Sequence, residues 1–502
     1  MHAIPKEAVI LSLQDLPLIN REAPESFQCD CGACPIALER PQQDIFVLFS
    51  EVRQDQRFIC NSQIIEMSLN PEYYALFNLI GSGGVIVVNK TAYKIFKFFE
   101  HPTSVGEINH RFEGKVYGLE TSIEQLIAFG AIHAEGVPPV TVFNPSSGLT
   151  AWLHVTNVCN LRCTYCYLHK TDDEMAEETG RAAIRALVDS AISHGFERLN
   201  LKYSGGEASL NFKLVLILHD YAKGLTQAKG LKLHGVMLTN GVAITHRMID
   251  ELKSREIGVM ISLDGIGEYN DVQRPFSNGK PSFQLVERTI NRLIESNLLP
   301  HISITISGHN YKGLTQVVRF ALDRNLTFSF NFFRDNECVS NLQGLKYQEQ
   351  EVIDGMKNAF TVIEEFMPPW SVLSAVLDRG QLMKPRKTPC GVGQDYVVID
   401  QKGGIAKCHM EIKKTIGNVF ENDPLTLIRQ DQIGVMNVSV EDKEGCRSCQ
   451  WKYWCSGGCP VSTYRTTGRY DIKSLNCNIY KAIYPEAIRL EGLRILKYAN
   501  TE

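Results

Sequence analysis

The sequence predicts an α/β protein whose parallel β-sheet is either curved or open. Short apolar or β-branched runs alternate with amphipathic stretches between residues 199 and 334, and residues 283–295 show the apolar spacing of a helix. Alternating strands and helices imply βα units and parallel strands. About six units are present, and their strands are expected at residues 151–156, 199–205, 233–241, 258–265, 301–308 and 328–335.

A smaller domain is predicted upstream of this sheet. Asn89 is placed to cap a helix, and a strand-like run at residues 84–88 precedes it. Two pairs with the spacing of a capping box follow, and each predicts the start of a short helix: Ser104 with Glu107, and Ser122 with Gln125. This pattern predicts a small winged-helix domain, which a Pro- and Ser-rich linker separates from the sheet.

The chain of 502 residues is long enough for about three domains. Downstream of Trp370 the sequence becomes rich in cysteine and in turn-forming residues. The predicted divisions are an N-terminal extension with a cysteine cluster at residues 1–65, the winged-helix domain at 66–140, the α/β domain at 148–370 and the cysteine-rich domain at 371–502.

Composition and charge exclude several classes of function. The formal net charge of -4 gives no basic field for nucleic acid. The N-terminus lacks a basic region followed by an apolar one, and no run of about 18 apolar residues occurs. We therefore expect a cytoplasmic protein that binds neither nucleic acid nor membrane. In that compartment, cysteines favour metal or redox chemistry over disulfide bonds.

Three cysteines follow the first predicted strand with the spacing CxxxCxxC: Cys159, Cys163 and Cys166. Ligands of such folds gather at the carboxyl ends of the strands. Three thiolates can hold three irons of a [4Fe-4S] cluster and leave the fourth iron open to an outside ligand. A zinc site, which would need a fourth protein ligand, and three unrelated core cysteines are the alternatives.

The CxxxCxxC motif and the motifs after the later strands together resemble those of radical S-adenosylmethionine (SAM) enzymes. Ser204, Gly205, Gly206 and Glu207 resemble the family's GGE motif, which binds the methionine amino group; glycines permit close backbone approach and a carboxylate suits an ammonium. The resemblance assigns further SAM contacts to Tyr165 near the adenine, Ser262 near the ribose and Arg274 near the carboxylate. It implies that reduction of SAM at the open iron gives a 5'-deoxyadenosyl radical, which removes a hydrogen atom from the substrate.

The C-terminal cysteines resemble the SPASM extension of radical SAM enzymes that modify peptides and proteins. The resemblance implies two auxiliary [4Fe-4S] clusters, one held by Cys446, Cys449, Cys455 and Cys477 and the other by Cys390, Cys408 and Cys459. Tyr396 stands where some relatives have a further cysteine, so the second cluster either keeps an open iron or borrows Cys338. A pair of structural zinc sites is the alternative.

The resemblance thus implies a partial (β/α)6 radical SAM barrel with a winged-helix-like domain before it and a SPASM domain after it. Its cofactors would be SAM and three [4Fe-4S] clusters. Cys29, Cys31, Cys34 and Cys60 could form an additional N-terminal metal site or remain unliganded thiols.

The predicted winged-helix segment resembles the PqqD-like element that binds the leader of a precursor peptide, usually as a strand added to its sheet. A DNA-binding winged helix is the alternative, which the absence of a basic run disfavours. We therefore expect a maturase that forms a carbon–carbon or thioether crosslink in a ribosomally made peptide, with flavodoxin or ferredoxin as electron donor. The catalytic residue is not predicted, because His409 is as well explained by a structural role as by that of a base.

Three other functions remain open. Backbone excision or epimerisation of a peptide would use the same radical. A sulfatase-type maturase, which forms formylglycine, shares the core but carries an acidic residue where this chain has His409. A zinc-stabilised binding protein would have no catalytic activity and would not cleave SAM.

Overall fold

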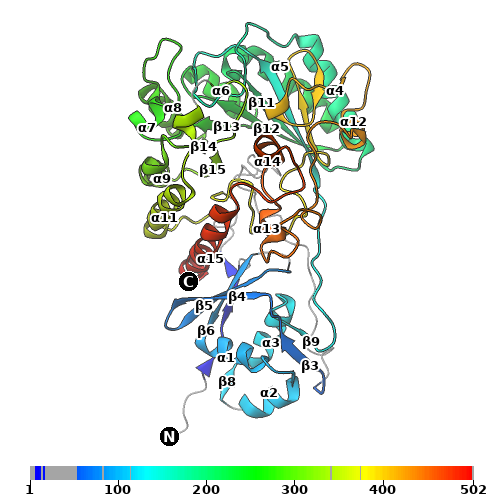
Figure 1. Cartoon of the computed structure of the whole chain (residues 1–502), viewed down its shortest axis with the longest axis vertical. Coiled ribbons are helices and arrows are strands. Elements are labelled where there is room, and N and C mark those ends of the chain that lie inside the picture. Colours follow the sequence, from blue (N-terminus) through cyan, green and yellow to red (C-terminus); the bar gives the residue numbers. More distant parts are fainter. Residues whose placement is uncertain are drawn as a thin grey trace.

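The computed structural model describes residues 6–12, 15–16, 54–81, 84–112, 115–339, 342–373 and 375–499. Within these residues the largest sheet has nine strands in the order β15-β14-β13-β12-β11-β10-β16-β17-β18 (Figure 1). All six predicted strands are present and parallel: β10 (Gly148–Thr156), β11 (Arg198–Gly205), β12 (Lys232–Thr239), β13 (Ile257–Ser262), β14 (His301–Ile306) and β15 (Phe328–Phe332). The sheet ends at β15 and β18 and is open, so the α/β prediction is confirmed.

Helices connect the parallel strands and cover the sheet. The longer ones are α4 (Glu177–Ser193), α5 (Phe212–Ala228), α6 (His246–Ser254), α8 (Phe283–Glu295), α9 (Leu314–Asp323) and α11 (Glu349–Phe366). Shorter turns are η5 (Ala208–Asn211), α7 (Glu268–Asp271), η6 (Tyr311–Gly313) and α10 (Leu342–Leu345). Eight of the nine residues of β10 are buried, as expected for a parallel strand covered on both faces.

Three strands from the cysteine-rich part extend the main sheet. β16 (Tyr396–Ile399) pairs in parallel with β10, and β17 (Gly404–Ala406) and β18 (Gly417–Asn418) continue the sheet in antiparallel register. The remaining elements of this part are η7 (His409–Glu411), α12 (Pro424–Gln430), α13 (Lys452–Cys455), α14 (Pro460–Thr467) and α15 (Cys477–Ala499). The cysteine-rich part therefore extends the main sheet beside β10, the strand that precedes the first cysteine motif.

Among the described residues, the N-terminal unit contains three small sheets and three helices. One sheet has the order β2-β6-β5-β4 and another β7-β3-β9, while in the third β1 pairs with β8. The strands are β1 (Lys6–Glu7), β2 (Ile10–Leu11), β3 (Arg57–Cys60), β4 (Ile64–Asn70), β5 (Tyr73–Asn78), β6 (Val85–Asn89), β7 (Thr103–Ser104), β8 (Val116–Tyr117) and β9 (Ile132–Ala134). The helices are α1 (Lys90–Phe98), α2 (Val105–Phe112) and α3 (Leu119–Ala128).

Two of the three predicted helix starts in this unit are confirmed. The side chain of Asn89 accepts a hydrogen bond from Ala92 N at 2.9 Å and caps α1. Ser104 and Glu107 form both bonds of a capping box at the start of α2. The third prediction is wrong because α3 begins at Leu119 after Gly118, and the hydroxyl of Ser122 donates back to the carbonyl of Gly118 inside the helix.

The C-terminal helix joins the N-terminal unit to the rest of the molecule. α15 packs against α11 on one side and against β5 and β6 on the other, and Figure 1 shows it between the two parts. The indole of Trp454 in α13 donates a 2.9 Å hydrogen bond to the carbonyl of Leu79, and its ring packs edge-on against Phe77. The N-terminal unit is thus docked on the cysteine-rich part. In the part of the chain described here, no helix is both long and apolar enough to cross a membrane.

Candidate functional site

The first cysteine motif lies in the loop after β10, at the carboxyl end of the parallel strands. Cys159, Cys163 and Cys166 are free thiols. Burial raises the pKa of Cys163 to about 12; Arg274 opposes this rise, while neighbouring Cys166 and Cys159 add to it. The structure therefore brings the three thiols together.

A lysine accompanies this group of thiols and was missed in the sequence analysis. Burial alone would lower the pKa of Lys170, but the neighbouring Cys166 and Cys159 raise it above its usual value. A half-buried ammonium suits a site that holds a net negative charge, as three thiolates with an iron–sulfur cluster would. No sequence motif marks Lys170, because its role depends on the folding of the loop back onto the cysteines.

The donor set of this site, three free cysteine thiols, fits the ligands of an iron–sulfur cluster. Among the described residues, no group of three or more Cys, His, Asp or Glu side chains converges closely enough to hold one metal ion. A zinc site needs its four ligand atoms about 2.0–2.3 Å from one point. A four-iron cluster instead binds each thiolate to a different iron, so its cysteines are spread apart.

Gly206 lets the end of β11 pass directly against the cysteine loop. Its N–H donates to Thr156 O at 2.6 Å, and the N–H of Glu207 donates to Val158 O at 2.9 Å. A Cβ at residue 206 would lie 2.3 Å from Val158 O and 2.5 Å from Asn157 O. The glycine requirement of the GGE-like motif thus comes from this close backbone contact. Ser204 and Gly205 are the last two residues of β11.

Glu207 is buried and ties β11 to β12. Its Oε1 accepts hydrogen bonds from Thr239 Oγ1 (2.6 Å) and Ser209 N (3.1 Å), and its Oε2 accepts one from Asn240 N (2.6 Å). Asn240 in turn donates to the side chain of Asn160, next to the first cysteine, at 2.7 Å. Glu207 therefore positions the loop after β12.

Tyr165 and Arg274 meet at a buried aspartate that the sequence analysis did not assign. The hydroxyl of Tyr165 donates to Asp264 Oδ2 at 2.6 Å, and Arg274 forms a hydrogen bond to Tyr165 and a 3.7 Å ion pair with Asp264. Asp264 Oδ1 accepts a hydrogen bond from Thr305 N at 2.8 Å. Burial raises the pKa of Asp264, and Arg274 opposes that rise. This network links the loops after β10 and β13 to strand β14. Ser262, the last residue of β13, is half-buried.

Replacing Asp264 by asparagine should destabilise this network. The neutral amide in D264N would leave Arg274 buried without its counter-charge, and removal of one partner from a buried pair costs about 3 kcal/mol. We expect D264N to lower Tm by several degrees in anaerobic thermal unfolding of the full chain. Asp323→Asn, at an exposed residue of α9, is the matched control and should leave Tm unchanged. Equal Tm values for the two variants would refute the structural role of Asp264.

The C-terminal cysteines fall into the two groups that the resemblance implied. Burial raises the pKa of Cys408 to about 12, and Cys459 and Cys390 add to this rise. Burial likewise raises the pKa of Cys455 to about 12, with Cys446 and Cys477 as neighbouring thiols. Cys449 lies next to both Cys446 and Cys477. The structure thus separates three cysteines from four.

The three-cysteine group borders a pocket that also contains Tyr396 and His409. The hydroxyl of Tyr396 and Nδ1 of His409 are hydrogen bonded at 3.0 Å, and the imidazole stacks on Trp152 at 4.6 Å. Burial, reinforced by Arg379, lowers the pKa of His409 well below its usual value, so the ring is neutral at pH 7. These contacts fix the ring and favour its structural role.

Two other cysteines have different neighbours. Cys338 donates a 3.2 Å hydrogen bond to Tyr167 O and neighbours Cys166, which places it at the first cysteine motif. Cys60 donates to Phe96 O at 3.1 Å, and burial raises its pKa to about 12. The other members of the suggested N-terminal site, Cys29, Cys31 and Cys34, lie outside the described residues.

Comparisons with known proteins agree with this geometry. Residues 153–321 match the model of the radical SAM superfamily. The chain is 22% identical over 372 residues to the cysteine-type anaerobic sulfatase-maturating enzyme of Clostridium perfringens (strain 13 / Type A), covering 68% of this chain and 95% of that protein. It is 23% identical over 350 residues to the antilisterial bacteriocin subtilosin biosynthesis protein AlbA of Bacillus subtilis (strain 168), covering 66% of this chain and 69% of AlbA.

Solved structures show the same fold. The enzyme anSMEcpe with bound AdoMet and Cp18Cys peptide has a TM-score of 0.57 at 18% identity, covering 70% of this chain and 99% of that one. Streptococcus suis SuiB bound to S-adenosylmethionine has a TM-score of 0.51 at 16% identity, covering 84% of this chain and 99% of SuiB. The chain therefore contains a radical SAM domain, which implies SAM and a [4Fe-4S] cluster. It is an enzyme related to peptide-modifying and sulfatase maturases.

Proposed function

We propose that this radical SAM enzyme oxidatively modifies a ribosomally synthesised precursor peptide and forms an intramolecular carbon–carbon or thioether crosslink. The observation that carries the proposal is the gathering of the ten motif cysteines into three groups, one at the carboxyl end of the parallel strands and two in the cysteine-rich part. Three groups suit one SAM-binding cluster and two auxiliary clusters that accept the substrate's electron. The related maturases support a peptide as substrate.

The first group would hold the SAM-binding cluster through Cys159, Cys163 and Cys166. When bound, this cluster supplies the electron that cleaves SAM to methionine and a 5'-deoxyadenosyl radical. Lys170 balances its negative charge, and Glu207 offers its carboxylate to the methionine amino group. Tyr165, Ser262 and Arg274 line the rest of the SAM site in this proposal.

The cysteine-rich part would hold the two auxiliary clusters. Cys446, Cys449, Cys455 and Cys477 provide four thiolates, and Cys390, Cys408 and Cys459 provide three. Burial alone would raise the pKa of Cys459, but Arg334 and Arg379 lower it below its usual value. This cationic surrounding favours a thiolate and stabilises added negative charge. A flavodoxin or ferredoxin in the cytoplasm would supply the first electron.

The N-terminal unit would bind the leader of the precursor in the manner of a PqqD-like domain. β4 ends its four-stranded sheet on one side, whereas β2 of the same chain already pairs with β6 on the other. An extended leader can therefore add to β4 directly, but it must displace Ile10 and Leu11 to reach β6.

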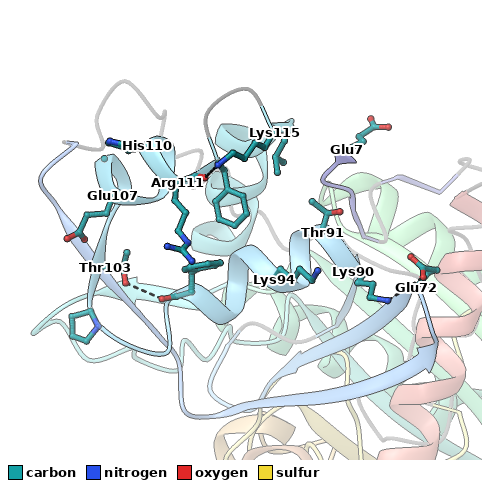
Figure 2. Close-up of a pocket in the computed structure, with 15 residues that line it drawn as sticks. Glu7, Glu72, Lys90, Thr91, Lys94, Thr103, Glu107, His110, Arg111 and Lys115 are labelled. Carbon is teal, nitrogen blue, oxygen red and sulfur yellow. Dashed lines mark hydrogen bonds and ion pairs between the residues drawn. The ribbon is translucent and has the colours of Figure 1, made fainter. Parts of the chain in front are cut away.

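A large open pocket lies on the helical side of this unit (Figure 2). It is lined by side chains of α1 and α2, by Lys115 and by residues of neighbouring strands and turns. The ionisable residues among them are Lys90, Lys94, His110, Arg111 and Lys115 together with Glu7, Glu72 and Glu107. Lys90 pairs with Glu72 at 3.6 Å, and Arg111 lies over the ring of Phe98. A surface of mixed charge with aromatic rings suits a peptide better than a phosphate backbone, which requires uniform positive charge.

Mass spectrometry of the short peptide encoded beside the gene tests the proposal. After anaerobic co-expression with the enzyme, we expect the peptide to lose two hydrogens per event, with the loss mapped to a linked pair of residues. Co-expression with C163A is the control and should leave the peptide unmodified. A peptide that binds the enzyme but keeps its mass would contradict the proposal. Backbone excision or a deuterium gain in heavy water, which indicates epimerisation, would overturn the crosslink while leaving the radical chemistry intact.

A sulfatase-type maturase is the second candidate, and the 22% identity to the Clostridium enzyme over most of its length favours it. The neutral His409 replaces the acidic residue that such enzymes carry, which argues against it. Turnover of a short sulfatase-motif peptide to formylglycine would establish this activity.

A further inference from the structure

Lys443 is a buried cation to which the candidate site described above assigns no role. Its side chain is 0% exposed, and its Nζ has no hydrogen-bond partner among the described residues. A buried ammonium is unfavourable unless an anion or a hydrogen-bond acceptor compensates for the lost water. Lys443 therefore points to a negatively charged group that belongs beside it.

Lys443 lies where the two C-terminal cysteine groups meet. The chain passes from Cys455 of the four-cysteine group to Cys459 of the three-cysteine group through Gly457 and Gly458, whose φ angles are +78° and +67°. A Cβ at Gly457 would lie 2.7 Å from both Nζ and Cδ of Lys443. The lysine side chain thus packs directly against the turn that joins the two groups.

Thiols of both groups affect the pKa of the Lys443 ammonium. Burial lowers the pKa of Lys443, and Cys446 and Cys455 from one group and Cys390 and Cys459 from the other oppose that effect. Two other cations near these thiols differ from it. Arg334 already pairs with Asp378 at 2.6 Å, and Lys481, next to Cys446 and Cys477, is exposed to water.

We propose that Lys443 donates charge-assisted hydrogen bonds to sulfur atoms of both auxiliary iron–sulfur clusters and thereby raises their reduction potentials. This inference rests on the proposed function, because it requires that the two cysteine groups hold clusters. The reduction potential of a cluster depends on nearby charge, on hydrogen bonds to its sulfurs and on solvent exposure. A cluster that gains an electron gains negative charge, so a buried ammonium stabilises its reduced state. The lysine keeps its protons, and no covalent bond forms or breaks.

Redox titration followed by electron paramagnetic resonance tests this role in the full chain, reconstituted anaerobically with iron and sulfide. We expect Lys443→Met to shift the midpoint potentials of both auxiliary clusters to more negative values at unchanged iron content. Lys481→Met is the matched control, since it removes an exposed lysine near the same thiols. Water already screens that charge, so its shift should be much smaller. Equal potentials in Lys443→Met and the wild type would overturn the proposal.

If Lys443→Met fails to retain its clusters, a measurement on the wild-type protein tests the proposal instead. Protein grown with 15N-lysine and reduced should show a nitrogen hyperfine coupling on an auxiliary-cluster signal, and absence of the coupling would overturn the proposal. Iron analysis separates this inference from the proposed function. If the C-terminal cysteines bind no iron, the proposed function fails; if they bind it and the potentials do not depend on Lys443, only this inference fails.

Discussion

Replacing Cys163 by alanine is expected to abolish the reductive cleavage of SAM while leaving most of the C-terminal iron bound. Cys163 is half-buried and neighbours its two partner thiols in the loop after β10, whereas the C-terminal groups are built from other elements. With one of three thiolates missing, the cluster that binds SAM is not held in place. The measurement is the amount of 5'-deoxyadenosine formed from SAM under anaerobic reduction, together with the iron content of the same sample.

Cys60→Ala is the matched control for this variant. Cys60 is a free thiol in β3 of the N-terminal unit, where it donates a hydrogen bond to the carbonyl of Phe96. We expect C60A to form 5'-deoxyadenosine at the wild-type rate. Retained cleavage of SAM by C163A would refute the assignment of the first cysteine group.

The second large effect is expected at Gly206. A methyl group at this position would meet the carbonyl oxygens of Val158 and Asn157 at 2.3 and 2.5 Å, so the backbone that leads into Cys159 must shift. A displacement of about 1 Å at a catalytic site can cost about a hundredfold in rate. We expect a loss of this order in the rate of SAM cleavage by G206A, measured as above.

Gly224→Ala provides the control for a glycine without such contacts. Gly224 lies within α5, and a Cβ there would have nothing within 4 Å. Alanine favours a helix over glycine by about 1 kcal/mol, so G224A should keep full activity and slightly raise Tm. Full activity in G206A would show that the close passage of β11 against the cysteine loop is not needed.

Features with a local physical signal were predicted correctly from the sequence. The six parallel strands are apolar runs bounded by turns, and the Asn89 cap needs only the residues that follow it. Ser122 was misplaced because the turn at Gly118, with φ of +74°, starts the helix earlier. Pairing of β16 with β10 joins residues about 250 positions apart, so no local sequence pattern predicts it.

Much of the candidate site depends on contacts that the sequence does not display. The cysteines were found by their spacing and by resemblance, and the structure groups them in the same way. Asp264, Lys170 and Lys443 were missed because each acts through its neighbours in the folded chain, which no motif marks. An unpaired buried charge can be recognised only from the folded structure, because burial and neighbouring groups are not apparent in the sequence.

The most direct test of the account is the isotope content of 5'-deoxyadenosine formed with a deuterated precursor peptide. The enzyme is reduced anaerobically with SAM and a precursor whose carbon-bound hydrogens are replaced by deuterium. We expect 5'-deoxyadenosine to gain deuterium in proportion to the peptide that is modified. Modified peptide together with 5'-deoxyadenosine that carries no deuterium would contradict hydrogen removal from the peptide by this radical.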